Sequence, residues 1–225
     1  MSDYKSSFIE LLVRSGVLLI GDFTLKSGRK SPYFVNTGNY KTGVQVEMLS
    51  TYYASLINEK LKGKFDVLFG PAYKGIPLCT LTAAALWRMY QIDVGYCFNR
   101  KEAKDHGEGG IFVGRKPQDG DRFLITEDVI SAGTAVREAM PILKAAADVT
   151  VTDMVISVDR AEVGYNGMTA KDEIKNDFGI TVYSIVTVVD ILDYLHNREI
   201  DGKIYIDDET KKRMEEYISK YCKLG

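Results

Sequence analysis

The sequence has little of what secreted, membrane-spanning or zinc-binding proteins need. Its three cysteines, Cys79, Cys97 and Cys222, stand far apart and match no paired spacing typical of a metal site. Sparse and odd-numbered cysteines are typical of a reducing compartment with mostly buried thiols. The chain also has no apolar signal core near its start and no uninterrupted apolar run of about 18 residues. We therefore expect a cytoplasmic protein that does not bind membranes.

An excess of charge and the common nucleotide motifs are also missing. Lysine and arginine number 29 against 31 acidic residues, so the net charge of −2 gives no general reason to expect a nucleic acid partner. No GxGxxG motif, Walker lysine motif or Ser-His-Asp order occurs. Of the two histidines, His196 has no chemical companions, and we expect it at the surface or at a helix cap. Trp87, the single tryptophan, lies in an apolar helix and is expected in the core.

The apolar pattern predicts an α/β fold. With 225 residues the chain fits one domain, which we divide into a small N-terminal lobe (1–40), an α/β core (43–195) and a tail with a helix (196–225). Short, nearly continuous apolar segments alternate with helical patterns, which indicates a mostly parallel sheet covered on both faces. These strands are expected at 67–69, 94–98, 122–126, 151–158 and 181–188. Pro141 is expected to kink or shorten the helix in which it lies.

The most informative stretch is 123–135, in which an apolar strand ends in two adjacent carboxylates. Small residues follow, and a helical pattern begins at Thr134. The free N–H groups of a helix N-terminus, with a partial charge of about +0.5, bind phosphate well. Gly133 lets the backbone approach a ligand closely. Two carboxylates would repel a phosphate unless they hold hydroxyl groups or a cation, so the stretch predicts a sugar phosphate site.

Two further loops at strand ends carry cations. Loop 70–77 contains two glycines, two prolines and Lys74, and a plain turn and an anion-binding loop are equally open readings. Loop 99–110 ends in three glycines within four residues and is rich in positive groups: Arg100, Lys101, Lys104 and His106. Mixed charge runs are usually solvated. The glycines nevertheless favour a closing lid whose cations neutralise a polyanionic leaving group.

Two smaller features stay open on the residues alone. Arg160 follows the strand at 151–158 and suits a carboxylate. A structural salt bridge to Asp159 or Glu162 is the stronger expectation. The basic turn 26–30 is equally compatible with a solvated hairpin and with an anion contact.

Four stretches, taken in order, resemble the type I phosphoribosyltransferases, which bind 5-phosphoribosyl-1-diphosphate (PRPP), and among them the orotate phosphoribosyltransferases. They are LKSGRKSPYF (25–34), FGPAYKGIP (69–77), YCFNRKEAKDHGEG (96–109) and EDVISAGTA (127–135). The acidic stretch alone indicates only the superfamily. The resemblance extends from about Phe8 to Asp193. It implies a central, mostly parallel sheet flanked by helices, with a small N-terminal hood lobe.

The resemblance implies transfer of ribose 5-phosphate from PRPP to orotate, giving orotidine 5′-phosphate and diphosphate in UMP biosynthesis. It assigns the ribose hydroxyls to Glu127 and Asp128, and the diphosphate to Tyr73 and Lys74. The 5-phosphate is assigned to the stretch Val129, Ile130, Ser131, Ala132, Gly133, Thr134 and Ala135. A mobile catalytic loop is implied, with Arg100, Lys101, Lys104 and His106 also facing PRPP. Lys26 is implied to lie beside both substrates, and the orotate contacts are Phe34, Val35, Ser131 and Arg160.

The same resemblance implies Mg²⁺ and a partner subunit. Mg²⁺ is expected to be carried mainly by PRPP oxygens, with no direct protein ligand. A homodimer is expected in which the catalytic loop reaches the neighbouring subunit's site. Three positions depart from the family's commoner residues, with Glu127 in place of Asp, Ser131 in place of Thr and Val35 in place of a second Phe.

Two other functions compete with this interpretation. A purine phosphoribosyltransferase would share the PRPP stretch, but it gives no reason for Lys26, the hood around Phe34, or the lid with His106. A catalytically silent, PRPP-sensing regulator on the same fold would bind RNA or DNA. The net charge of −2 and the complete lid motif argue against the regulator.

Overall fold

The computed structural model describes residues 3–25, 27–104, 110–130, 133–164 and 166–224, with the backbone alone at 103 and 104. These residues form two compact units, each described by itself below. Unit 1 comprises Met1–Leu49, Val158–Thr169 and Val186–Gly225, and unit 2 comprises Ser50–Ser157 and Ala170–Ile185. None of the helices in the described ranges is both long and apolar enough to cross a membrane.

Unit 2 is built on a six-stranded sheet with the order β5-β4-β3-β6-β7-β8. The strands are β3 (Val67–Gly70), β4 (Gly95–Lys104), β5 (Gly110–Gly114), β6 (Arg122–Thr126), β7 (Thr150–Asp159) and β8 (Thr181–Thr187), the last two ending in unit 1. β3 pairs in parallel with β4 and β6, and β6 pairs in parallel with β7. β5 is antiparallel to β4. The expected mostly parallel α/β sheet is thus confirmed.

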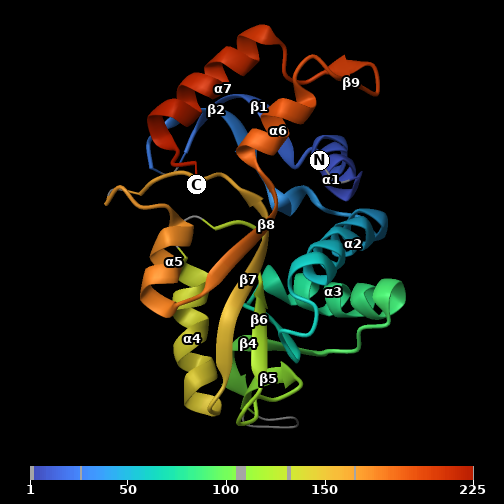
Figure 1. Cartoon of the computed structure of the whole chain (residues 1–225), viewed down its shortest axis with the longest axis vertical. Coiled ribbons are helices and arrows are strands. Elements are labelled where there is room, and N and C mark those ends of the chain that lie inside the picture. The colour runs from blue at the N-terminus through green and yellow to red at the C-terminus, as the bar shows by residue number, and fades with distance from the viewer. Residues whose placement is uncertain (1–2, 26, 105–109, 131–132, 165, 225) are drawn as a thin grey trace. The chain divides into compact units, whose positions relative to one another are not determined.

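Apolar strands and helix faces form the core of unit 2. All four residues of β3 and the last four of β6 are buried, as expected for central strands covered on both faces. Helices α4 (Thr134–Ala146) and α5 (Ala170–Phe178) lie on one side of the sheet, and α3 (Gly75–Tyr90) lies on the other (Figure 1). α2 (Gly43–Lys60) begins in unit 1 and continues in unit 2. α4 buries Val136, Ala139, Met140 and Leu143 against the strands.

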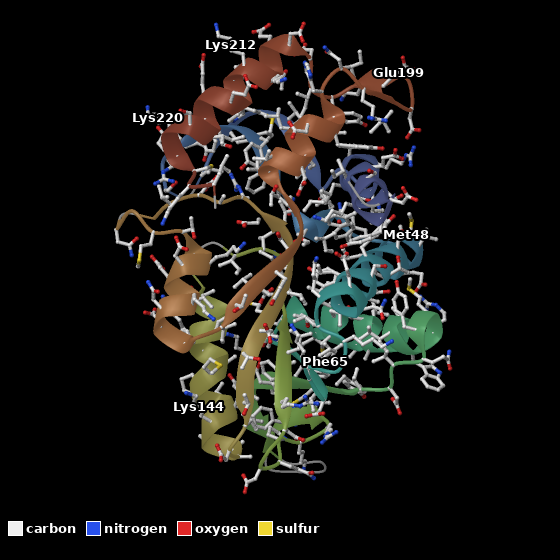
Figure 2. The ribbon with its side chains drawn as sticks, viewed as in Figure 1. Met48, Phe65, Lys144, Glu199, Lys212 and Lys220 are labelled. Carbon is white, nitrogen blue, oxygen red and sulfur yellow. The ribbon has the colours of Figure 1, made fainter. Side chains whose placement is uncertain are left out.

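Unit 1 contains a β-hairpin and several helices. Strands β1 (Leu18–Thr24) and β2 (Lys30–Val35) pair antiparallel, so the basic turn between them is a hairpin turn. The other elements are α1 (Asp3–Arg14), the 3₁₀ turn η1 (Thr37–Asn39), α6 (Val188–Leu195), β9 (Glu199–Ile200), β10 (Lys203–Ile204) and α7 (Asp208–Tyr221). α7 packs against β2, with its buried residues on the inner face and Lys212 and Lys220 on the outer face (Figure 2). His196 caps α6 at its C-terminus, as expected.

Two expectations from the sequence are wrong. The region 99–110 is not all loop, because β4 continues to Lys104 and β5, which the pattern did not indicate, begins at Gly110. Trp87 is not in the core, since 54% of it is exposed on α3. Pro141 lies inside α4, which continues past it to Ala146, and the expected kink stays a prediction. A missing N–H removes one helical bond, and the packing of the apolar face of α4 offsets that loss.

The turn between β3 and α3 depends on two glycines in close contact. A Cβ placed on Gly70 would lie 2.1 Å from the carbonyl oxygen of Gly75 and 2.7 Å from Sγ of Cys79. A Cβ on Gly75 would lie 2.8 Å from the carbonyl carbon of Gly70. The two backbones therefore touch directly, which fixes the loop that carries Lys74.

We predict that Gly70→Ala lowers the free energy of unfolding by about 1–3 kcal/mol, the usual cost of overpacking a tight site. Urea denaturation measures this change. Gly43→Ala is the matched control, because a Cβ there meets no atom within 4 Å. An unchanged unfolding free energy in Gly70→Ala would contradict the close-contact role of this glycine.

Candidate active site

The backbone of the acidic pair that follows β6 is held by the neighbouring strand β7 and by helix α2. The N–H of Glu127 donates to the carbonyl of Val155 (3.0 Å), and Tyr53 Oη donates to the carbonyl of Glu127 (2.7 Å). The carbonyl of Asp128 accepts from both the N–H and Oγ of Ser157, at 2.8 and 2.6 Å. Hydrogen bonds with three other residues therefore fix the backbone position of the pair.

The carboxylates themselves are buried and share few compensating charges. Glu127 and Asp128 are each 8% exposed. Lys74 Nζ lies 2.8 Å from Asp128 Oδ2, and the N–H of Val129 donates to Asp128 Oδ1 (2.7 Å). Glu127 Oε1 accepts from the N–H of Asp128 (2.9 Å). Burial, followed by the nearby charge of Asp128, raises the pKa of Glu127 to about 8.

A helix N-terminus follows the acidic pair, as predicted. Gly133 has φ of +65° and caps α4, which begins at Thr134. A Cβ on Gly133 would lie 3.2 Å from two side-chain atoms of Ile174, so a larger residue would be both strained and crowded. The first N–H groups of α4 have no acceptor within the helix and suit an anion. Ser131 and Ala132 lie outside the described residues.

The loop that carries Lys74 is tied to the neighbouring strand. The N–H of Ala72 donates to Oδ1 of Asn99 on β4 (3.1 Å), and the N–H of Gly75 donates to the carbonyl of Pro71 (3.0 Å). The Ala72–Tyr73 peptide bond is cis, and Tyr73 is 69% exposed. Through the ion pair with Asp128, the structure brings Lys74 to the acidic residues. That this loop binds an anion stays a prediction.

Two cations of β4, Arg100 and Lys101, already have partners in this structure. Arg100 Nη1 donates to the carbonyl of Gly110 (2.9 Å). Lys101 Nζ lies 2.7 Å from Glu138 Oε2, a partner on α4 that the sequence did not indicate. The Lys104 side chain and His106 lie outside the described residues.

Three of the candidate orotate residues, Phe34, Val35 and Arg160, belong to unit 1. Phe34 and Val35 lie on β2, where Val35 is 7% exposed and Phe34 stacks at 5.7 Å from Phe23. Arg160 pairs with Glu162 at 2.5 Å, which is the salt bridge expected on the residues alone. Lys26 lies outside the described residues.

Within the described ranges, no group of three or more His, Cys, Asp or Glu side chains is placed to hold a metal ion. Mg²⁺ carried by PRPP therefore stays a prediction.

Glu127 generates a prediction about stability and pH. Because its pKa is raised on folding, the native state binds more protons than the unfolded state between the ordinary glutamate value of about 4.3 and about 8. The free energy of unfolding therefore falls as pH rises through this window, with a slope of up to about 1.4 kcal/mol per pH unit. Glu127→Gln removes this ionisation, so we expect a flatter pH profile and higher stability than the unaltered protein at pH 8.

Urea unfolding at several pH values between 5 and 8 tests this expectation. Glu138→Gln is the matched control, because the side chain of Glu138 is 55% exposed and gains little from neutralisation. Equal pH slopes in Glu127→Gln and the unaltered protein would contradict the buried, proton-binding state of Glu127.

Comparisons with known proteins agree with this geometry. The phosphoribosyl transferase domain family matches residues 36–185. Orotate phosphoribosyltransferase of Clostridium beijerinckii is 52% identical over 98% of this chain and 99% of its own. That of Agathobacter rectalis is 50% identical over 99% of this chain and 100% of its own.

A solved structure extends the agreement to the fold. Orotate phosphoribosyltransferase of Francisella tularensis has a TM-score of 0.83 and 37% identity, and the match covers 96% of this chain and 100% of that chain. The family resemblance predicted from the four sequence stretches is confirmed. The chain belongs to the orotate phosphoribosyltransferases, which are pentosyltransferases of pyrimidine biosynthesis with the type I phosphoribosyltransferase fold.

Proposed function

We propose a division of labour for the reaction of this family, in which ribose 5-phosphate passes from PRPP to a nitrogen of orotate. The products are orotidine 5′-phosphate and diphosphate. The observation that carries the proposal is the buried pair Glu127 and Asp128, set beside Lys74 and followed by the N-terminus of α4. Unit 2 is assigned the ribose phosphate and diphosphate, and unit 1 is assigned most of the orotate contacts.

Glu127 and Asp128 accept hydrogen bonds from the ribose 2- and 3-hydroxyls. Hydroxyl donors replace the water that the pair lacks in its buried position, without adding negative charge beside the carboxylates. The 5-phosphate lies on residues 129–135, where the first N–H groups of α4 and the hydroxyl groups of Ser131 and Thr134 donate to it. The negative charge of the 5-phosphate is thereby placed at the N-terminus of α4 and not against the two carboxylates.

The diphosphate is taken by cations that are otherwise bound to carboxylates. Lys74 pairs with Asp128, and Lys101 pairs with Glu138. Tyr73, Arg100, Lys104 and His106 complete the proposed set. Because diphosphate carries more charge than a carboxylate, it competes well for these lysines, and the contacts strengthen as the leaving group gains charge.

Mg²⁺ is proposed to enter with PRPP. The oxygen donors of a diphosphate and of ribose hydroxyls suit Mg²⁺, so the ion is proposed to have no direct protein ligand. When bound, Mg²⁺ would neutralise charge on the diphosphate.

Orotate is assigned to Lys26, Phe34, Val35, Ser131 and Arg160. A guanidinium group matches the planar carboxylate of orotate, and the apolar residues of β2 suit the face of its ring. Positive charge develops on the ribose C1 as the diphosphate leaves. The residues assigned to each substrate then hold the reactants in line and exclude water, which would otherwise hydrolyse PRPP.

A homodimer and a cytoplasmic location complete the proposal. Apolar side chains exposed in unit 2, Trp87 (54%), Met89 (40%) and Tyr96 (42%), are better suited to a second copy of the chain than to water. The catalytic loop of one subunit would then serve its neighbour. The free cysteines agree with a reducing compartment.

One assay separates this proposal from its competitors. We expect the protein, mixed with PRPP and Mg²⁺, to consume orotate but neither hypoxanthine nor uracil, as followed by the ultraviolet absorbance of each base. Consumption of hypoxanthine instead of orotate would indicate a purine enzyme. No consumption of any base, with PRPP still bound, would indicate a PRPP-sensing regulator.

A further inference from the structure

Arg160 forms an ion pair with Glu162, which also accepts a hydrogen bond from Tyr217. Its Nη2 lies 2.5 Å from Glu162 Oε1, with 15% of the arginine side chain exposed. The approach lacks hydrogen-bond alignment, so Nη2 is buried with no hydrogen-bond partner among the described residues. The guanidinium group therefore has donor capacity left for a planar anion, while Glu162 fixes where it lies.

The C-terminal helix supplies the next link. Tyr217 of α7 donates its hydroxyl group to the same oxygen, Glu162 Oε1, at 2.8 Å. Its ring meets the ring of Tyr33 edge to face at 5.9 Å. Tyr33 in turn faces Arg160, with the guanidinium carbon 4.8 Å from the ring centre and Nε 3.4 Å from the hydroxyl oxygen. The four side chains thus form a closed ring of contacts within unit 1.

The backbone is tied in the same place. The N–H of Lys223 donates to the carbonyl of Ala161 and the N–H of Val163 donates to that of Tyr221, both at 2.9 Å. Cys222 Sγ donates to the carbonyl of Arg160 (3.3 Å). Ala161 has φ of +52°, a left-handed conformation that alanine adopts only when its surroundings hold it. The end of the chain thus supports the turn that brings Glu162 back to Arg160.

We propose that Tyr217 is a positioning residue that sets the affinity for orotate, acting through Glu162 on Arg160 without touching the substrate. This inference rests on the proposed function, in which Arg160 binds the orotate carboxylate. An arginine side chain loses much rotamer freedom on binding, and a network that restrains it beforehand reduces that cost. Tyr217 lies far along the chain from Arg160. We expect Tyr217 to affect orotate alone, because the residues assigned to PRPP lie in unit 2 with the exception of Lys26.

Steady-state kinetics of Tyr217→Phe test the inference. Loss of one hydrogen bond of about 1 kcal/mol corresponds to about a fivefold change, so we expect the KM for orotate to rise about fivefold while the KM for PRPP stays within about twofold. Tyr194→Phe is the matched control. It also removes a Tyr–Glu hydrogen bond from unit 1, since Tyr194 Oη donates to Glu10 Oε1 (2.7 Å), and we expect it to change neither KM.

The outcomes are distinguishable. An unchanged KM for orotate in Tyr217→Phe, or an equal rise in both KM values, would overturn the inference while leaving the proposed function intact. No orotate consumption by the unaltered protein would overturn both. Should Tyr217→Phe fail to fold, Glu162→Gln replaces it, because it keeps the side-chain size but removes the charge that holds Arg160. The same selective rise in the KM for orotate is then expected, and its absence overturns the inference.

Discussion

The ion pair between Lys74 and Asp128 is the interaction on which the site in unit 2 depends. Two adjacent carboxylates that are only 8% exposed would repel each other strongly if both were charged and unpaired. Lys74, itself 63% exposed, neutralises Asp128 at 2.8 Å. For Glu127, burial outweighs the charge of Lys74, so its pKa is raised instead. Asp128 is therefore stabilised by an ion pair, and Glu127 by binding a proton. A bound substrate can change both the ion pair and the protonation.

The scaffold explains why this costly arrangement persists. Hydrogen bonds from Tyr53 and Ser157 hold the backbone of the acidic pair, and β6 behind it is buried among its neighbours. The close contact of Gly70 with Gly75 fixes the loop that brings Lys74 to the pair. The stability of the sheet thus offsets the cost of burying two carboxylates. Such a trade-off between stability and function is common in enzymes. In unit 1 the same principle applies to Arg160, whose position depends on Glu162 and on the end of the chain.

Local patterns in the sequence predicted most of the sheet and the helix after the acidic pair. Continuous apolar runs such as those of β3 and β6 indicate strands buried on both faces of a sheet. A glycine directly before Thr134 indicates the start of a helix, and Gly133 is the N-cap of α4. Trp87 was misplaced because an apolar helix face does not reveal whether another chain or the protein's own core covers it. β5 was missed because the strand has only five residues, none of them fully buried, so its apolar pattern is weak.

Contacts between distant residues were beyond the same reasoning. The partners Lys101 and Glu138, or Glu162 and Tyr217, are 37 and 55 positions apart, and only the fold brings them together. Glu162 was indicated as a partner of Arg160 because the two are close in sequence. Tyr217 carried no signal beyond its place on the apolar face of an amphipathic helix, which any core residue would share.

The central claim is that the acidic pair anchors the ribose phosphate and leaves orotate to other residues. Asp128→Asn tests it most directly. The KM for PRPP and the KM for orotate are each measured by steady-state kinetics. Asp177→Asn is a matched control, because it removes a carboxylate that pairs with Arg137 at 2.5 Å elsewhere in unit 2. The account predicts that Asp128→Asn raises the KM for PRPP about tenfold or more, because a charged hydrogen-bond partner is lost. The KM for orotate is expected to change little. An equal loss for both substrates would contradict it.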